Sequence, residues 1–181
     1  MDTTLYEQYR SGMRTGDAIF FRGTGLISRI IQWTTRSHFS HVAMVIRRTA
    51  QLDSLGYRIL VLQATHKYGV NSPPLSRVLS AHKGQAWWCQ IDHPRMQQQW
   101  PNYQALLEDW ADSQEGRDYD LPGALAVRLP FFRERTGMAF CSELYAQAFK
   151  ENFGLLDLPK PAPSDLVHDL LLAVHPLVSL I

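Results

Sequence analysis

The sequence has few of the residues on which metal sites and disulfide frameworks depend. Two cysteines occur in 181 residues, Cys89 and Cys141, and neither has a second cysteine nearby. His38 and His41 stand three residues apart where a turn is predicted to lead into a strand, and the H-E-x-x-H pattern does not occur. Zinc sites need closely spaced cysteine and histidine ligands. We therefore predict neither a metal site nor a cofactor.

The sequence also has no large excess of basic over acidic residues, or of acidic over basic ones. The chain carries 18 basic and 17 acidic residues, a formal net charge of +1, and its densest basic group, Arg47-Arg48, is predicted to flank a hairpin. Proteins that bind nucleic acid need a concentrated basic surface, so no nucleic-acid partner is expected. Because 45% of the residues are hydrophobic, the chain can bury a substantial core, and we predict one domain over residues 1–181.

The first seven residues, Met1 to Glu7, have neither the basic start nor the apolar run of a signal peptide. This predicts a cytoplasmic protein, with export by a route that needs no signal peptide left open. In a reducing compartment a disulfide between Cys89 and Cys141 is not expected. Cys89 lies in the apolar segment 87–91, which is typical of a strand, and we predict that it packs in the core.

Cys141 stands where an amphipathic helix is predicted to begin. The helix is expected over residues 142–153, with Leu144, Ala148 and Phe149 on one stripe and Gly154 as its stop. A thiol at a helix start faces unpaired backbone N–H groups and the positive end of the helix dipole, which favour the thiolate that attacks carbonyl carbons. The alternative is that Cys141 is a small buried apolar residue.

His41 begins an apolar segment, 41–47, that is typical of a strand. The first residue of a strand is a rigid position for a general base that has to reach a helix start opposite. Cys141 and His41 are therefore candidates for a nucleophile and its base, although cysteine and histidine also occur together by chance.

Five short motifs in a fixed order resemble those of the NlpC-type cell-wall hydrolases, a papain-like superfamily. They are G-D-A-I-F-F at 16–21, H-V-A-M at 41–44, V-L-Q-A at 61–64, G-R-D-Y at 116–119 and F-C-S-E-L at 140–144. In ordinary members the cysteine motif comes first, so this order resembles the circularly permuted branch, which includes the YiiX/YaeF-like proteins and lecithin:retinol acyltransferase. The C-S-E-L variant and the late P-S-D-L at 163–166 are similar to the YiiX/YaeF-like side.

The resemblance implies a role for each matching residue. Cys141 would be the nucleophile, His41 the general base, and Gln63 the polar third residue that orients the imidazole. A neutral amide stabilises imidazolium less than a carboxylate does, so a lower histidine pKa is expected. Thr65 and His66 are rival third residues, of which Thr65 shares the strand face of Gln63.

Two residues are predicted to contact the substrate. Tyr119 matches the tyrosine of the family's glycine loop, although a packing role is equally open. Ser40 directly precedes the histidine motif and is expected to help hold a peptide backbone.

The fold class implied is α+β, a permuted papain-like domain with an antiparallel sheet or partial barrel packed against the helix that begins at Cys141. Strands are predicted at 17–22, 41–47, 57–65 and 86–91, and an extended turn at 70–74. Helices are predicted at 5–12, 25–35 and 102–114, with a single helical turn at 75–79. The helix at 25–35 is expected to pack across the barrel.

The expected function is thiol-dependent acyl hydrolysis, first of a peptide amide such as a cell-wall stem peptide. A lipid-directed acyl hydrolase or acyltransferase is the alternative, and a non-catalytic binding module is a third. The apolar segments 121–132 and 166–181 bear on this choice. The second is too interrupted to span a bilayer and is expected to cap the core, dock a partner or lie on a membrane surface. Nothing in the sequence indicates the oligomeric state.

Overall fold

The computed structural model describes residues 4–48, 56–91, 93, 102–118, 140–158, 161–168 and 178–179. Six strands form a sheet in the order β4-β3-β2-β1-β5-β6, and every neighbouring pair is antiparallel. Their bounds are β1 Ala18–Gly23, β2 His41–Arg48, β3 Arg58–Thr65, β4 Gly69–Asn71, β5 Gly84–Cys89 and β6 Val178–Ser179. The four predicted strands are confirmed. The extended turn predicted at 70–74 is partly wrong, because its start belongs to β4 and pairs with β3.

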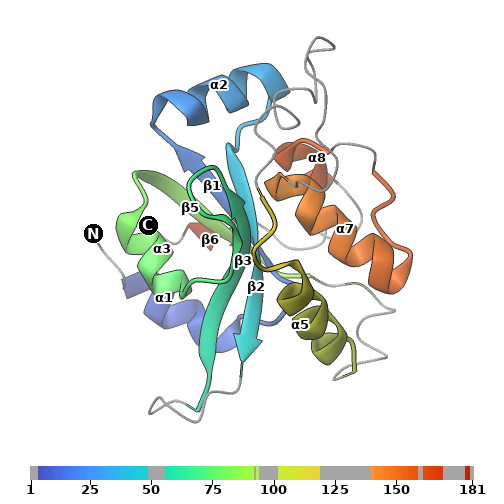
Figure 1. The fold of residues 1–181 in the computed structure, drawn as a ribbon. Coiled ribbons are helices and arrows are strands. Elements are labelled where there is room, and N and C mark those ends of the chain that lie inside the picture. Colours follow the sequence, from blue (N-terminus) through green and yellow to red (C-terminus); the bar gives the residue numbers. More distant parts are fainter. Residues whose placement is uncertain are drawn as a thin grey trace.

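The helices cover both faces of this sheet. Figure 1 shows α5 (Asn102–Gln114), α7 (Cys141–Phe153) and α8 (Pro163–His168) on one face, and α1 (Thr4–Tyr9) and α3 (Leu75–Ala81) on the other. A short 3₁₀ helix, Arg10–Gly12, follows α1. The predicted helices at 5–12 and 102–114 are confirmed, and the single turn expected at 75–79 is a longer helix. The α+β class is confirmed.

Alternating side chains in the central strands build two cores. In β2, Val42, Met44 and Ile46 join the cluster that contains α5 and α7, whereas Ala43 and Val45 join the cluster that contains α1 and α3. This is the period of two expected for a strand that is covered on both faces. The face on which a β2 residue lies therefore decides which set of helices its side chain meets.

Helix α7 packs as its sequence predicts. Leu144, Ala148 and Phe149 are buried, and the helix ends at Gly154, which has a φ of 63°. The N–H of Gly154 donates to the carbonyl of Lys150, and the N–H of Leu155 donates to that of Phe149. This is the left-handed glycine cap that satisfies the last carbonyls of a helix.

Helix α2 (Leu26–Thr35) connects β1 to β2 and lies at one end of the sheet (Figure 1). The expectation that its apolar residues pack across the barrel is wrong. Ile31 is buried, but Leu26, Ile27, Ile30 and Trp33 are exposed. A helix at the end of a sheet has only one narrow strip against the protein, and that strip is filled largely by Ile31 and two threonines.

Asp17 joins β1 to the end of β5 from a buried position. Its carboxylate accepts hydrogen bonds from the N–H of Arg14 (2.8 Å), the indole N–H of Trp88 (2.9 Å) and the N–H of Ile91 (3.1 Å). Burial raises the pKa of this carboxyl to about 7, although the three donors act in the opposite direction. The aspartate of the G-D motif is thus a structural group.

Part of the chain's apolar end also belongs to the sheet. Val178 and Ser179 form β6 and pair with Trp88 and Trp87 of β5, and Leu166 is buried in α8. The rest of the predicted tail, 169–177 and 180–181, and the apolar segment 121–132 lie outside the described residues. Among the helices that the structure describes, none has the length and apolar character needed to cross a membrane.

The contact between β5 and β1 gives a direct test of the fold. Gly84 has a φ of 146°, and a Cβ added there would lie 2.0 Å from the carbonyl oxygen of Arg22. Gly84→Ala should therefore lower the free energy of unfolding by roughly 2 kcal/mol or more in chemical denaturation. Gly25→Ala is the matched control, because a Cβ there meets nothing within 4 Å. Equal stability of the two variants would contradict this register.

Candidate active site

The thiol of Cys141 lies at the first residue of α7. The residue before it, Phe140, is extended, and no side chain caps the helix start, so the first N–H groups of α7 are available to the sulfur. Cys141 is only 6% exposed. Met44 and Leu62 from the sheet and two residues of α7 enclose the small space beside it, so the thiol lies against the α7 face of the sheet.

The surroundings of this thiol act on its pKa in opposite directions. Burial raises the pKa of Cys141 and is the largest effect, while the N–H groups of Val42, Ser142 and Cys141 itself lower it. The net result is a pKa above the ordinary value for a thiol. The N–H groups at the helix start favour the thiolate, as expected, but in this resting structure burial outweighs them.

His41 begins β2 as predicted, and its side chain lies on the other face of the sheet. Its ring is 5.5 Å from that of Phe21, the residue with which it pairs in β1. The ring of His82 approaches the same phenylalanine at 5.0 Å. Phe21 belongs to the core cluster formed with α1 and α3. The imidazole is therefore held by aromatic contacts on the α3 side of β2.

A chain of side-chain hydrogen bonds orients this imidazole. Nε2 of His41 is 3.3 Å from Oε1 of Gln63, and Nε2 of Gln63 donates to Oδ1 of Asn71 at 3.3 Å. Since an amide oxygen can only accept, His41 Nε2 carries the proton and Nδ1 has a free lone pair. Gln63 is buried and pairs with Asn71 between β3 and β4, so strand pairing sets the direction of the amide.

The charge state of His41 follows from its surroundings. The pKa of His41 is lowered to about 4, mainly by burial; the bond to Gln63 raises it, and the nearby His82 lowers it. A lower pKa was expected from the neutral amide, but the main cause is loss of hydration. At neutral pH the imidazole is therefore uncharged and able to accept a proton.

The thiol and the imidazole approach the start of β2 from opposite faces of the sheet. The sulfur is next to the N–H of Val42, one residue along the strand from His41. Within the described residues no hydrogen bond joins Cys141 to His41, and the imidazole's hydrogen bond goes to Gln63. The catalytic roles of Cys141, His41 and Gln63 stay predictions. In the resting structure the thiol and the imidazole are both uncharged.

The other predicted residues fall in different places. Thr65 lies on the face of Gln63, but its buried Oγ1 has no hydrogen-bond partner, and His66 is exposed. The substrate-binding role of Ser40 stays a prediction. Its buried hydroxyl accepts from the N–H of Gly23 (3.0 Å) and donates to the carbonyl of Phe21 (3.2 Å). Tyr119 lies outside the described residues.

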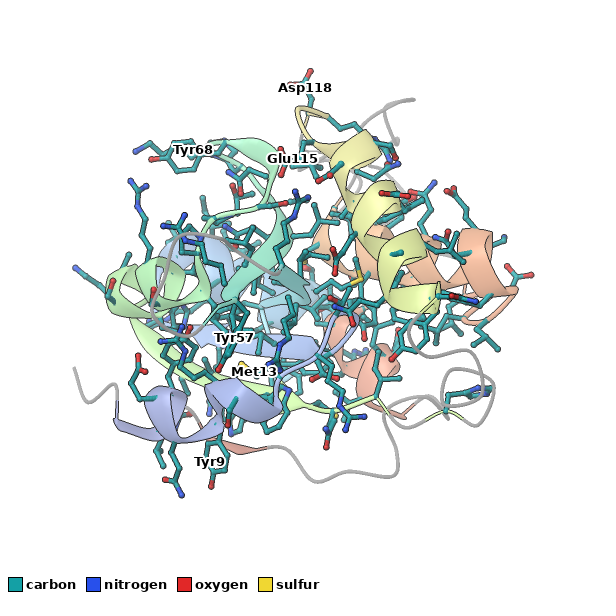
Figure 2. The ribbon with its side chains drawn as sticks, turned by 90° about the horizontal axis from the view of Figure 1, so that it is seen from below. Tyr9, Met13, Tyr57, Tyr68, Glu115 and Asp118 are labelled. Atoms are coloured by element: carbon teal, nitrogen blue, oxygen red, sulfur yellow. The ribbon has the colours of Figure 1, made fainter. Side chains whose placement is uncertain are left out.

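A pocket of about 550 Å³ opens beside Gln63 on the α3 face. Its walls come from β3, β4, α3 and the turn between the two strands, and Asn71 and His82 both line it. Tyr68, which is 64% exposed, projects from the rim (Figure 2). The pocket reaches the orienting amide of the site and is large enough for part of a substrate.

Three groups that contact the candidate site residues were not predicted from the sequence. Asn71 orients Gln63, His82 lowers the pKa of His41, and the Val42 N–H faces the sulfur. Asn71 could have been inferred only from β4, which was predicted as a turn. A backbone N–H leaves no signal in the sequence. His82 follows α3, where nothing in the local pattern connects it to His41.

Comparisons with known proteins give one line of support for the fold. No family model matches the chain, and no curated protein matches it. The crystal structure of metalloprotein yiiX from Escherichia coli O157:H7 aligns with a TM-score of 0.59 and 22% sequence identity, over 78% of this chain and 67% of that one. A YiiX-like fold is therefore shown in broad terms, and a likeness at this identity extends no further than the fold.

That neighbour is described as a metalloprotein, and a metal ion would need a cluster of ligands. No group of three or more histidine, cysteine, aspartate or glutamate side chains comes together in the part of the chain that the structure describes. His41 and His82 share a neighbour in Phe21, but two ligands are fewer than a resident ion needs. The described residues do not fit a metal site.

The hydrogen bond between His41 and Gln63 predicts the effect of changing the amide. Gln63→Leu should lower turnover roughly tenfold or more and lower the pKa of His41 further, because the bond to Gln63 raises it. Gln63→Glu should retain turnover and raise that pKa, since a carboxylate stabilises imidazolium. NMR titration of His41 and steady-state rates measure both. Thr65→Val is the matched control, and an effect of Thr65→Val without one from Gln63→Leu would transfer the role to Thr65.

The raised pKa of Cys141 predicts how alkylation by iodoacetamide depends on pH. The pKa of the Cys141 thiol lies above its ordinary range, and above about pH 4 His41 carries no positive charge that would lower it. The rate of Cys141 alkylation, measured in a Cys89→Ala background, should therefore still be rising at pH 8. Cys89, whose pKa burial raises to about 11, should react more slowly in Cys141→Ala. A flat rate from weakly acidic to weakly alkaline pH would instead indicate a preformed thiolate–imidazolium pair.

Proposed function

We propose that this protein is a thiol-dependent acyl hydrolase in which Cys141 is the nucleophile, His41 the general base and Gln63 the orienting residue. The observation that carries the proposal is the His41–Gln63 hydrogen bond at the start of β2, where the next N–H faces the sulfur of Cys141. An oriented imidazole with an unprotonated Nδ1 at a strand start, and a thiol at a helix start that meets the next residue of that strand, are the two groups that nucleophilic catalysis needs.

The proposed reaction starts from an uncharged thiol and an uncharged imidazole. As Sγ of Cys141 bonds to the carbonyl carbon, the thiol proton passes to Nδ1 of His41, and the oxyanion accepts a hydrogen bond from the N–H of Cys141. The carbon–nitrogen or carbon–oxygen bond then breaks as His41 returns the proton to the leaving group, which leaves a thioester. Water then attacks this thioester as His41 takes a proton from it; the carbon–sulfur bond breaks and His41 returns the proton to the sulfur, which releases the acid and the free thiol.

We propose a permuted papain-like domain of the NlpC type, acting on a peptide amide such as a cell-wall stem peptide. The support is the order of the five sequence motifs together with a YiiX-like fold. The pocket beside Gln63, lined by Thr65 and Asn71 as well as apolar groups, offers hydrogen-bonding partners to a peptide backbone.

A lipid ester or amide is the second candidate substrate, and one observation favours it. Leu26, Ile27, Ile30 and Trp33 are exposed on α2, which leads directly into the strand of His41. Enzymes that act on acyl chains have to remove them from a lipid phase, and exposed apolar side chains near the site aid that transfer.

Substrate assays with matched variants test the proposal. Wild-type protein and Cys89→Ala should release product from peptidoglycan fragments or phospholipid vesicles, and Cys141→Ala should lose at least about a hundredfold in rate. Mass spectrometry of acid-quenched reactions should find the acyl group on Cys141. Full activity in Cys141→Ala would refute the proposal. Saturable ligand binding without turnover in the wild type would identify a binding module instead.

A further inference from the structure

Helix α2 carries most of the large apolar side chains that the described residues leave exposed. Four of the six large apolar side chains that remain exposed lie on it, with exposed fractions of 75% for Leu26, 48% for Ile27, 40% for Ile30 and 77% for Trp33. Leu26, Ile30 and Trp33 are spaced i, i+4 and i+7, and therefore lie on one face of the helix. They form one stripe, which we call the α2 face.

The charges around this stripe have one sign. Arg29 and Arg36 are exposed beside it, and Arg22 is exposed at the end of β1. No aspartate or glutamate occurs between Asp17 and Asp53, and no described carboxylate forms an ion pair with these arginines. Among the residues that the structure describes, the α2 face is thus a basic amphipathic surface with no acidic group to neutralise it.

The neighbouring helix does not supply the missing negative charge. Helix α8 contacts the end of α2 through Ser164, which shares a hydrogen bond of 2.7 Å with Ser37 and accepts another from the N–H of His38. The single acidic residue of α8, Asp165, is partly buried and accepts from the N–H of Ala162 at 2.8 Å. Its carboxylate is used within its own turn.

The apolar stripe and its arginines favour one kind of partner for the α2 face over another. A second copy of the chain, paired through the same face, would bring arginines opposite arginines, which is unfavourable. Exposed leucine, isoleucine and tryptophan beside arginine are instead the composition of a helix that lies in the interface of an anionic bilayer. Tryptophan is suited to that depth because its ring is apolar and its N–H is polar.

We propose that the α2 face is a docking surface for an anionic lipid bilayer. Helix α2 lies at one end of the sheet, apart from the helices that cover the two faces (Figure 1), and its apolar side chains are exposed there. The helix is anchored next to the candidate site, because Gln32 donates to the carbonyl of Gly23 at 3.0 Å and Gly23 donates to Ser40, the residue before His41. Docking would place the start of β2 close to the membrane surface.

Vesicle flotation with the full-length Cys141→Ala protein tests this independently of catalysis. Vesicles of phosphatidylcholine alone are compared with vesicles that also contain phosphatidylglycerol, at low and high salt. The protein should bind the anionic vesicles, more weakly at high salt. Leu26→Ser/Trp33→Ser should lower the partition coefficient at least about tenfold, because two apolar side chains no longer enter the interface. Arg29→Gln/Arg36→Gln should lower it by about fivefold for each arginine.

Matched variants control for general effects of these changes. Tyr68→Ser/Leu106→Ser removes an exposed aromatic and an exposed leucine elsewhere, and Arg58→Gln/Arg77→Gln removes two exposed arginines from other elements. Both should bind as the parent does. Thermal unfolding should be unchanged in all four, since the altered side chains are exposed.

Three outcomes would overturn the proposal. The first is absence of binding to anionic vesicles by the parent protein. The second is binding that survives Leu26→Ser/Trp33→Ser but is lost when Leu170, Leu171 and Leu172 are replaced by serine, which would place docking in the apolar tail. The third is a dimer in sedimentation that Leu26→Ser/Trp33→Ser dissociates, which would show that a second copy covers the α2 face.

Discussion

The alternation of side chains along β2 is the constraint on which the candidate site depends. His41 is directed to the face of α3, and Val42 and Met44 are directed to the face of α7. A thiol at the start of α7 therefore reaches the sheet from the side opposite to the imidazole. The proposed mechanism requires both groups to meet a substrate at the first residue of the strand, because farther along β2 the sheet would separate them.

The same arrangement determines the charge state of the pair. Burial lowers the pKa of His41 and raises that of Cys141, so both groups are neutral at rest. A neutral pair cannot gain from mutual attraction in the ground state, so in the proposed reaction proton transfer has to accompany attack on the carbonyl. The N–H groups at the start of α7 and at Val42 gain importance in such a site, because they stabilise charge that appears only during the reaction.

The sequence predicted the elements whose signals are local. The stripe of Leu144 and Phe149, the glycine stop of α7 and the alternation of β2 are all contained in short windows. Positions that depend on long-range packing were less predictable. The apolar pattern of α2 indicated a helix but not which side would face the protein, and Asn71 meets Gln63 only through the pairing of β3 with β4. The net effect on the Cys141 pKa required the burial of the thiol, which no local pattern contains.

The raised pKa of Asp17 makes the stability of the fold depend on pH. Its pKa is about 7 in the folded protein against 3.8 for an ordinary aspartate, so between these values the folded state holds a proton that the unfolded state has lost. The stability that this carboxyl contributes is present at low pH and is lost as the pH rises through 7. Alkaline buffers that increase the thiolate fraction of Cys141 therefore also leave an ionised carboxylate buried between β1 and β5. This loss of stability is complete once the pH is well above 7, so a more alkaline buffer adds no further cost at Asp17.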